Sequence, residues 1–207
     1  MTETPLPAIL LAGGLARRMG GGDKPLQSIG GRSLLARVIE RLQPQCDALA
    51  LNANGDAARF AHIGLPVIAD SIAGFPGPLA GVLAGLDWAA TDNHGAQFML
   101  SAPADCPFLP TDLVARLRQT QRETSADIVT ASSGGRRHPV IALWRVNLRD
   151  ELRRTLSSEG SRKVESFVAR FAHAQVDWPV TPFDPFFNAN TPGDLNEADR
   201  VAAAYGV

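Results

Sequence analysis

A loop rich in glycine and basic residues joins the apolar run Pro7–Leu11 to a lysine. Its glycines and cations are Gly13, Gly14, Arg17, Arg18, Gly20, Gly21, Gly22 and Lys24. Backbone N–H groups approach phosphate oxygens closely only where no Cβ intervenes, and the arginines and the lysine supply positive charge. The loop therefore favours binding of a nucleoside triphosphate through its phosphates, with a flexible surface turn as the alternative.

This loop differs from two familiar phosphate-binding motifs. A P-loop carries Ser or Thr after its lysine, whereas Pro25 follows Lys24 here. A dinucleotide-binding fingerprint needs the spacing G-x-G-x-x-G, which the segment from Gly13 to Arg18 lacks. The loop is therefore of another type.

Three further polar residues each follow an apolar run, namely Asn52, Asp70 and Asp105. Open α/β sheets bind ligands outside the carboxyl ends of their strands, so we expect these side chains to meet the glycine-rich loop at one edge. A hard dication prefers carboxylate oxygen, which makes Asp105 the predicted magnesium ligand. A turn cap before Pro107 is the alternative for Asp105.

The elements that would position these residues alternate along the chain. Short apolar runs that predict buried strands are Pro7–Leu11, Ala48–Leu51, Leu65–Ala69, Gln97–Ser101 and Asp127–Ala131. Helical periodicity appears at 34–42 after a Ser33 cap, at 79–86, and at 113–117 behind Thr111. This alternation predicts an α/β fold with a mostly parallel, Rossmann-like sheet.

The last third of the chain is less regular. Pro139–Val146 predicts a further strand and Glu165–Phe171 part of a helix. The stretch from Trp178 to Asn190 is rich in Pro and Phe and is expected to form a surface loop near the site. Thr191 followed by Pro192 is typical of a helix start, with Thr as the cap.

Composition limits the class of protein. A chain of 207 residues with 45% hydrophobic content fits one domain, residues 1–207. A net charge of −1 argues against nucleic acid or an acidic membrane as partner, and no apolar run reaches the roughly 18 residues of a membrane span. The N-terminus lacks a basic, apolar leader, so the cytoplasm is expected.

Cysteine and lysine are scarce. Cys46 and Cys106 are too few for a disulfide framework and are expected to be free thiols. Lysine occurs only at Lys24 and Lys163, against eighteen arginines, which favours a role for a compact ammonium at these positions.

The loop signature Leu11-Ala12-Gly13-Gly14, Arg18-Met19-Gly20-Gly21 and Asp23-Lys24 resembles that of nucleotidyltransferases with a GT-A-like fold, and among them the molybdenum cofactor guanylyltransferases. Further blocks resemble that family in order: Asn52-Ala53-Asn54, Asp70-Ser71, Pro76-Gly77-Pro78-Leu79-Ala80-Gly81, Pro103-Ala104-Asp105-Cys106-Pro107, Arg137-His138-Pro139 and Asn188-Ala189-Asn190-Thr191-Pro192. The resemblance covers nearly the whole chain. It implies a three-layer α/β/α domain whose first half, to about residue 110, binds GTP and whose second half binds the acceptor.

The resemblance also implies an activity, the transfer of GMP from GTP to the terminal phosphate of Mo-molybdopterin with release of pyrophosphate. Mg²⁺ is the expected cofactor, with Mn²⁺ as a substitute. The expected GTP-binding residues are Leu11, Ala12, Gly13, Gly14, Lys24, Asn52, Asp70 and Asp105. Arg18, Lys24 and Asp105 are expected to be catalytic, the two cations by balancing charge on the triphosphate.

Several of these residues have plainer alternatives. Asn52 is otherwise a turn former at a strand end, and Asp70 forms an Asx turn if it contacts neither guanosine nor the metal. The expected acceptor-binding residues are His138, Arg162, Lys163, Asn188 and Asn190. A base is not required of His138, because a phosphate nucleophile is already ionised, and a structural histidine is its alternative. Lys163 otherwise lies at a solvated helix end.

Rival functions remain open at this point. A relative that uses CTP on the same cofactor tends to carry Ala at the position of Gly13, and a sugar-phosphate nucleotidyltransferase is usually longer. A non-catalytic nucleotide sensor or pterin carrier would need neither Lys24 nor Asp105. Beyond GTP and Mo-molybdopterin, the molybdenum-insertion protein and molybdoenzyme chaperones are the partners implied, and a monomer is expected.

Overall fold

A central sheet organises the computed structural model, which describes residues 4–13, 24–72, 74, 77–91, 95–158 and 163–207. Within these residues the sheet has seven strands in the order β5-β4-β1-β6-β8-β7-β9. Their bounds are β1 Pro7–Leu11, β4 Ala48–Asn52, β5 Val67–Ile68, β6 Phe98–Pro103, β7 Ile128–Ser133, β8 Arg136–Arg145 and β9 His173–Trp178. A separate hairpin pairs β2 (Ser28–Ile29) with β3 (Arg32–Ser33).

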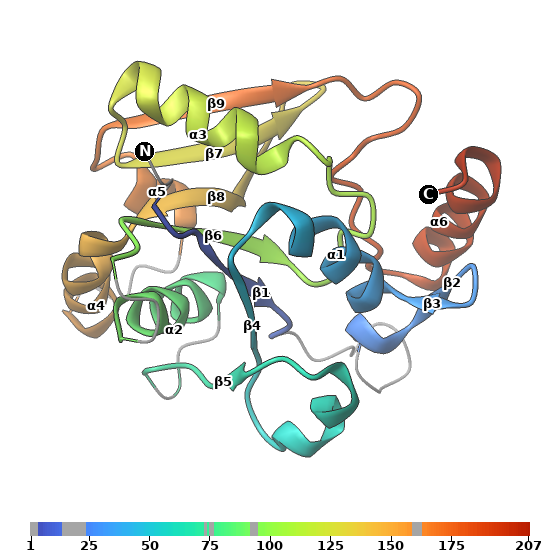
Figure 1. The fold of residues 1–207 in the computed structure, drawn as a ribbon, viewed down its shortest axis with the longest axis horizontal. Coiled ribbons are helices and arrows are strands. Elements are labelled where there is room, and N and C mark those ends of the chain that lie inside the picture. Colours follow the sequence, from blue (N-terminus) through green and yellow to red (C-terminus); the bar gives the residue numbers. More distant parts are fainter. Residues whose placement is uncertain (1–3, 14–23, 73, 75–76, 92–94, 159–162) are drawn as a thin grey trace.

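All strands of the large sheet except β8 run in one direction, so the predicted mostly parallel α/β sheet is confirmed. Leu11, the last residue of β1, pairs with Asn52 at the end of β4 and with Pro103 near the end of β6. The carboxyl ends of neighbouring strands therefore reach one edge together. Figure 1 shows β6 and β9 pointing toward the side of the molecule where α6 and the β2–β3 hairpin lie.

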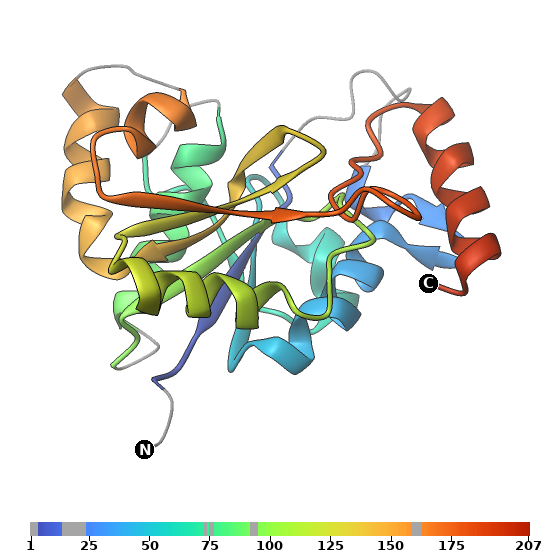
Figure 2. The same cartoon turned by 90° about the horizontal axis from the view of Figure 1, so that it is seen from above.

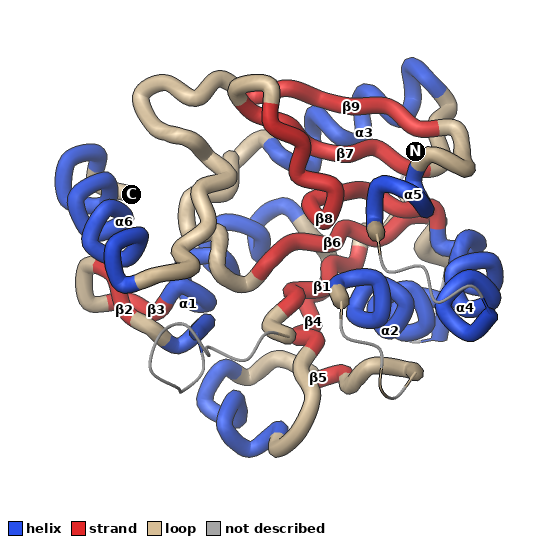
Figure 3. Tube along the Cα trace, turned by 180° about the vertical axis from the view of Figure 1, so that it is seen from behind, coloured by secondary structure: helices blue, strands red, loops and turns tan. Residues whose placement is uncertain are grey.

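Helices cover both faces of the sheet (Figure 2). Their bounds are α1 Leu34–Leu42, α2 Pro78–Thr91, α3 Leu113–Thr124, α4 Arg149–Ser158, α5 Val164–Val168 and α6 Pro192–Tyr205. Seen from behind, α2, α4 and α5 lie in front of the sheet (Figure 3). The cluster on that face contains Ile9 of β1, whereas Ala8 and Leu10 pack with α1 and α3 on the other. The period-2 alternation of β1 thus fills both cores of a three-layer domain.

Local sequence signals set the ends of two helices. The Ser33 hydroxyl accepts a hydrogen bond from the N–H of Ala36, which confirms the predicted cap of α1. Thr191 caps α6 and forms a reciprocal capping box with Asp194. Both caps satisfy N–H groups that have no partner within the helix.

The β2–β3 hairpin and α6 form a small unit beside the main sheet. Gly30 and Gly31 have φ of +56° and +75°, as a two-residue turn of this hairpin requires. The buried guanidinium of Arg37 donates to the carbonyl oxygen of Ile29 at 2.8 Å and to that of Val207 at 2.6 Å. This arginine therefore ties the hairpin to Val207, two residues beyond the end of α6.

Three segments differ from the sequence-based expectations. Trp178, predicted to start a loop, is the last residue of β9, and the helix predicted to reach Phe171 ends earlier, at Val168. Helix α4 was not predicted at all, because its only buried apolar positions are Leu152 and Leu156. No helix among the described residues is long and apolar enough to cross a membrane.

Candidate active site

The edge at the ends of β1, β4 and β6 gathers the predicted site residues that the structure describes. The N–H of Ala12 donates to the carbonyl oxygen of Asn52 at 2.9 Å, and the N–H of Ala104 donates to that of Leu11 at 3.0 Å. These bonds extend the parallel pairing past the strand ends. They place Gly13, Asn52 and Asp105 on one rim, as a parallel sheet requires.

A lysine ammonium is the centre of this rim. Lys24 is the first residue of a short 3-10 helix, Lys24–Leu26, and its side chain is 13% exposed. Its Nζ donates to a carboxylate oxygen of Asp105, to Oδ1 of Asn188 at 3.0 Å and to Oδ1 of Asn190 at 2.5 Å. The two asparagines lie more than 160 residues away in the sequence. Both halves of the chain therefore meet at one positive charge.

The segment before α6 brings the asparagines to this position. The N–H of Ala189 donates to the carbonyl oxygen of Asp105 at 3.2 Å, so the segment lies against the turn after β6. The N–H of Asn190 donates to the Asp194 carboxylate at 2.8 Å. Because Asp194 also belongs to the capping box of α6, the start of that helix holds Asn190 in place.

A second polar cluster lies at the ends of β4 and β5. Asn52, only 3% exposed, donates from Nδ2 to the carbonyl oxygen of Ile68 at 3.1 Å and to the Asp70 carboxylate at 2.9 Å. Asn54 donates to the other oxygen of Asp70 at 2.7 Å and accepts from its N–H at 2.9 Å. Asp70 is thus held by two asparagine side chains, and sequence reasoning did not assign a role to Asn54.

Helix α2 approaches this cluster closely. A Cβ built on Gly81 would lie 2.2 Å from Oδ1 of Asn52, whereas one on Gly13 would lie 3.9 Å from the same oxygen. Real Cβ atoms essentially never show a contact of 2.2 Å, so a side chain at residue 81 would force Asn52 to move. Glycine at position 81 therefore lets the first turn of α2 reach the asparagine.

His138 lies at the start of β8, in the acceptor half predicted from the sequence. Its Nε2 lies 2.8 Å from the Ser133 hydroxyl, which donates to the Asp184 carboxylate at 2.8 Å. The imidazole ring packs 4.9 Å from that of Phe186. Burial lowers the pKa of His138 below its ordinary value of 6.5, against the opposing effect of Asp184. The histidine is therefore buried in a hydrogen-bonded network.

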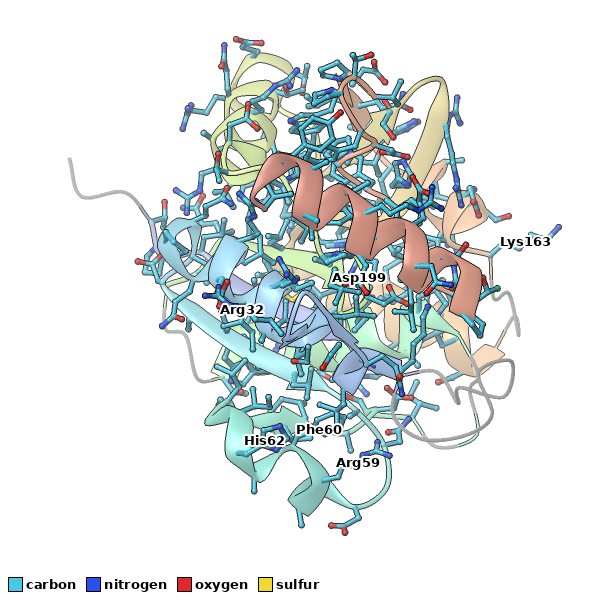
Figure 4. All side chains as sticks on the ribbon, turned by 90° about the vertical axis from the view of Figure 1, so that its right-hand side faces the viewer. Arg32, Arg59, Phe60, His62, Lys163 and Asp199 are labelled. Carbon is cyan, nitrogen blue, oxygen red and sulfur yellow. The ribbon has the colours of Figure 1, made fainter. Side chains whose placement is uncertain are left out.

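Some predicted residues cannot be placed in this way. Gly14, Arg17, Arg18 and Arg162 lie outside the described residues. Lys163 is exposed just before α5, and Figure 4 shows its side chain pointing outward at the edge of the molecule. Sequence reasoning missed Ser133 and Asp184, whose only signal was their place beside predicted site blocks.

The oxygen atoms around Lys24 suit a hard cation. One carboxylate and two amide oxygens converge there, and these are ligand types that Mg²⁺ accepts when substrate phosphates complete its octahedron. Among the residues the structure describes, no group of three or more His, Cys, Asp or Glu side chains could hold a metal on its own. Lys24 donates to one oxygen of the Asp105 carboxylate, and the other oxygen fits Mg²⁺ bound together with substrate phosphates.

Known proteins resemble this chain in sequence and in fold. Residues 8–176 match the family described as a MobA-like NTP transferase domain. A protein of Rhodopseudomonas palustris strain BisB5 named molybdenum cofactor guanylyltransferase is 68% identical over 196 residues, which cover 95% of this chain and 93% of that protein. Another of that name, from Mesorhizobium japonicum, is 47% identical over 199 residues and 95% of both chains.

Two solved structures share the fold. Molybdopterin-guanine dinucleotide biosynthesis protein A from Archaeoglobus fulgidus has a TM-score of 0.74 at 23% identity and covers 96% of this chain and 99% of that one. Rv0371c from Mycobacterium tuberculosis, in complex with manganese, has a TM-score of 0.70 at 16% identity, with coverages of 96% and 100%. With the identities of the sequence relatives, the family is established: this chain is a nucleotidyltransferase that belongs to the molybdenum cofactor guanylyltransferases.

Proposed function

We propose that this chain transfers GMP from GTP to the terminal phosphate of Mo-molybdopterin. A phosphate oxygen of the acceptor attacks the α-phosphorus, the bond from that phosphorus to its bridging oxygen breaks, and pyrophosphate leaves with the electron pair. The observation that carries the proposal is the contact of Lys24 with Asp105, Asn188 and Asn190 at the strand ends. The names of relatives up to 68% identical support the same reaction.

Lys24 is the proposed charge-balancing group. Its ammonium is fixed before any substrate arrives, so stabilising the departing pyrophosphate requires little rearrangement of the protein. Arg18, outside the described residues, is proposed to add a second positive charge from the glycine-rich loop. Because the acceptor phosphate is already ionised, positioning and charge neutralisation suffice and no side chain needs to act as a base.

Asp105 is the proposed ligand of Mg²⁺, or of Mn²⁺ in its place. When bound there, the metal would supply positive charge that neutralises the triphosphate and the departing pyrophosphate. The amide oxygens of Asn188 and Asn190, which accept from Lys24 as Asp105 does, support this assignment. The manganese complex of the fold relative from M. tuberculosis supports it as well.

The two parts of the single domain take different substrates in this proposal. Residues up to about 110 bind GTP, with Leu11 to Gly14 and the Asn52–Asp70 pair on the nucleoside side. The remainder binds the acceptor through His138, Arg162, Lys163, Asn188 and Asn190. The contact of Asn188 and Asn190 with Lys24 supports the view that the two parts meet where the phosphates of the two substrates would lie. The location in the cytoplasm and the monomeric state stay predictions. So does binding to the molybdenum-insertion protein and to molybdoenzyme chaperones.

The test is transfer by the purified protein. We expect pyrophosphate and the guanine dinucleotide to form from GTP, Mg²⁺ and Mo-molybdopterin, and GTP to compete better than CTP or ATP for binding. A sugar-activating enzyme would instead release pyrophosphate with a sugar phosphate as acceptor. No dinucleotide under conditions where a known guanylyltransferase makes it would contradict the proposal.

Matched variants separate catalysis from folding. Asp105→Asn should lower the transfer rate about 100-fold or more, because a weaker metal ligand leaves the charge that develops in the transition state less stabilised. Asp127→Asn is the control, because Asp127 also pairs with a cation, Arg145 at 2.7 Å, but precedes β7 at the opposite edge of the sheet. Equal transfer rates for Asp105→Asn and Asp127→Asn would show that Asp105 has no role in catalysis. Unchanged delivery of cofactor by Asp105→Asn would favour a carrier.

A further inference from the structure

The segment that follows β9 has a second anchor, away from Lys24. The Asp184 carboxylate accepts a hydrogen bond from the Ser133 hydroxyl at 2.8 Å and one from the N–H of Phe186 at 2.9 Å, both at Oδ1. Its carbonyl oxygen accepts from the N–H of Phe187 at 3.1 Å. Asp184 therefore holds a tight turn of residues 184–187 against the end of β7.

This anchor continues into the acceptor half. Ser133 is 2% exposed, and since its hydroxyl proton goes to Asp184, its oxygen is left to accept from Nε2–H of His138. The order of donors is thus His138, Ser133, Asp184. A carboxylate at the end of such a chain strengthens the hydrogen bonds before it.

Phe186 connects the turn held by Asp184 with the residues beside Asp105. Its ring, 2% exposed, packs 4.9 Å from His138 and 5.3 Å from Trp178, and its carbonyl oxygen accepts from the Cys106 thiol at 3.8 Å. Cys106 is the neighbour of Asp105. Two residues beyond Phe186, Asn188 begins the contact with Lys24.

We propose that Asp184 is a positioning residue for guanylyl transfer, an inference that rests on the function proposed above. By holding the turn at 184–187, it sets where Asn188 and Asn190 meet Lys24. Within the described part of the chain, no hydrogen bond or ion pair joins Asp184 to Lys24 or to Asp105. Loss of the Asp184 carboxylate lets Asn188 and Asn190 shift, so the Lys24 ammonium is held less tightly.

The two lysines of the chain allow a direct test without substrate. Lys24 is 13% exposed and hydrogen-bonded, whereas Lys163 is exposed, so trace acetylation read by mass spectrometry gives a Lys24 to Lys163 labelling ratio. In Asp184→Ala we expect this ratio to rise about tenfold, the change that follows loss of a hydrogen bond to a charged group. In Asp184→Asn, which keeps an acceptor oxygen, the ratio should stay within about threefold of wild type.

Asp177→Ala is the matched control. Asp177 accepts from the hydroxyl of Ser132 at 2.7 Å, so it also binds a buried serine of β7, but it lies in β9 and not in the turn. Its ratio should equal that of wild type. Ser133→Ala removes the donor to Asp184 and should raise the ratio in the same direction, which keeps the test available if Asp184→Ala does not fold.

Kinetics give the second readout. For Asp184→Ala, kcat should fall about tenfold while KM for GTP changes less than about twofold, because Asn52 and Asp70 are untouched. If the melting temperature falls but the labelling ratio and kcat match those of Asp177→Ala, Asp184 is only structural and the inference is wrong. Absence of transfer by the wild type would instead contradict the proposed function, and the labelling ratio would still decide the role of Asp184.

Discussion

The side chain of Asn52 occupies the space where a side chain at Gly81 would begin. The ideal Cβ of residue 81 lies 2.2 Å from Oδ1 and 2.9 Å from Cγ of this asparagine. Gly81→Ala should therefore displace Asn52 from Asp70 and weaken GTP binding about tenfold, close to the effect of one lost hydrogen bond. Calorimetric titration with GTP measures this change.

Gly85→Ala is the control for that variant. Its Cβ would lie 2.6 Å from Ile9 and 2.7 Å from Met99, inside the core of the same helix–sheet contact. Overpacking of this kind costs about 1–3 kcal/mol of stability. We expect Gly85→Ala to lower the unfolding free energy but leave GTP affinity unchanged, and equal affinities for the two variants would speak against a nucleotide role for Asn52.

Gly13→Ala tests the basis of nucleotide choice. The added Cβ meets Oδ1 of Asn52 at 3.9 Å, an ordinary van der Waals contact, so the melting temperature should stay near that of wild type. If this position selects the base, the preference for GTP over CTP in a competition assay should narrow about tenfold or more. An unaltered preference would show that guanine is selected elsewhere.

His138 makes stability depend on pH. Its pKa lies below 6.5 in the folded protein because burial disfavours the imidazolium, whereas the unfolded chain titrates near that ordinary value. As pH falls below about 6.5, the unfolded state takes up a proton that the folded state resists, so stability decreases until the folded pKa is passed. Urea unfolding from about pH 7.5 to 5 should show this loss in wild type and less of it in His138→Gln. Parallel curves would rule out His138 as the cause.

Both cysteines should be unreactive in the folded protein. Burial raises the pKa of Cys46 to about 12 and also raises that of Cys106, so little thiolate is present at neutral pH. A disulfide reagent at about pH 8 should therefore modify neither thiol within minutes, and both in denaturant. Rapid reaction of Cys106 alone would indicate that the turn beside Asp105 opens readily.

Strands and helices with dense apolar patterns were predictable from the sequence. Pro7–Leu11 was predicted with the bounds it has. Its five consecutive apolar residues, which the structure buries or half-buries, form a run typical of a buried strand and show no amphipathic helical pattern. Leu34–Leu42 was equally clear after its Ser33 cap. Strand β9 was missed because only Val176 and Trp178 are buried on it, and the one residue between them, Asp177, is polar.

The candidate site was predictable only in part. Asn52, Asp70 and Asp105 meet at one rim because parallel strands end together, and a pattern of apolar runs is enough to infer that. The contact of Lys24 with Asn188 is different, because it depends on how the segment after β9 is folded over a separation of 164 residues. Spacing in the sequence carries no information over such separations, and the same holds for the contact between Ser133 and Asp184, which are 51 residues apart.

The reversed direction of β8 separates changes in the turn before β8 from changes in the strands β1, β4 and β6. Because β8 runs against its neighbours, its first residues reach the rim through the Gly134–Gly135 turn, while β1, β4 and β6 arrive there at their last. Under the proposed function, insertions or substitutions in that turn would alter acceptor binding beside His138 without shifting the register of the strands that end near Lys24. If the two substrates bind as proposed, evolution can therefore change the affinity for the acceptor while the affinity for the nucleotide is kept.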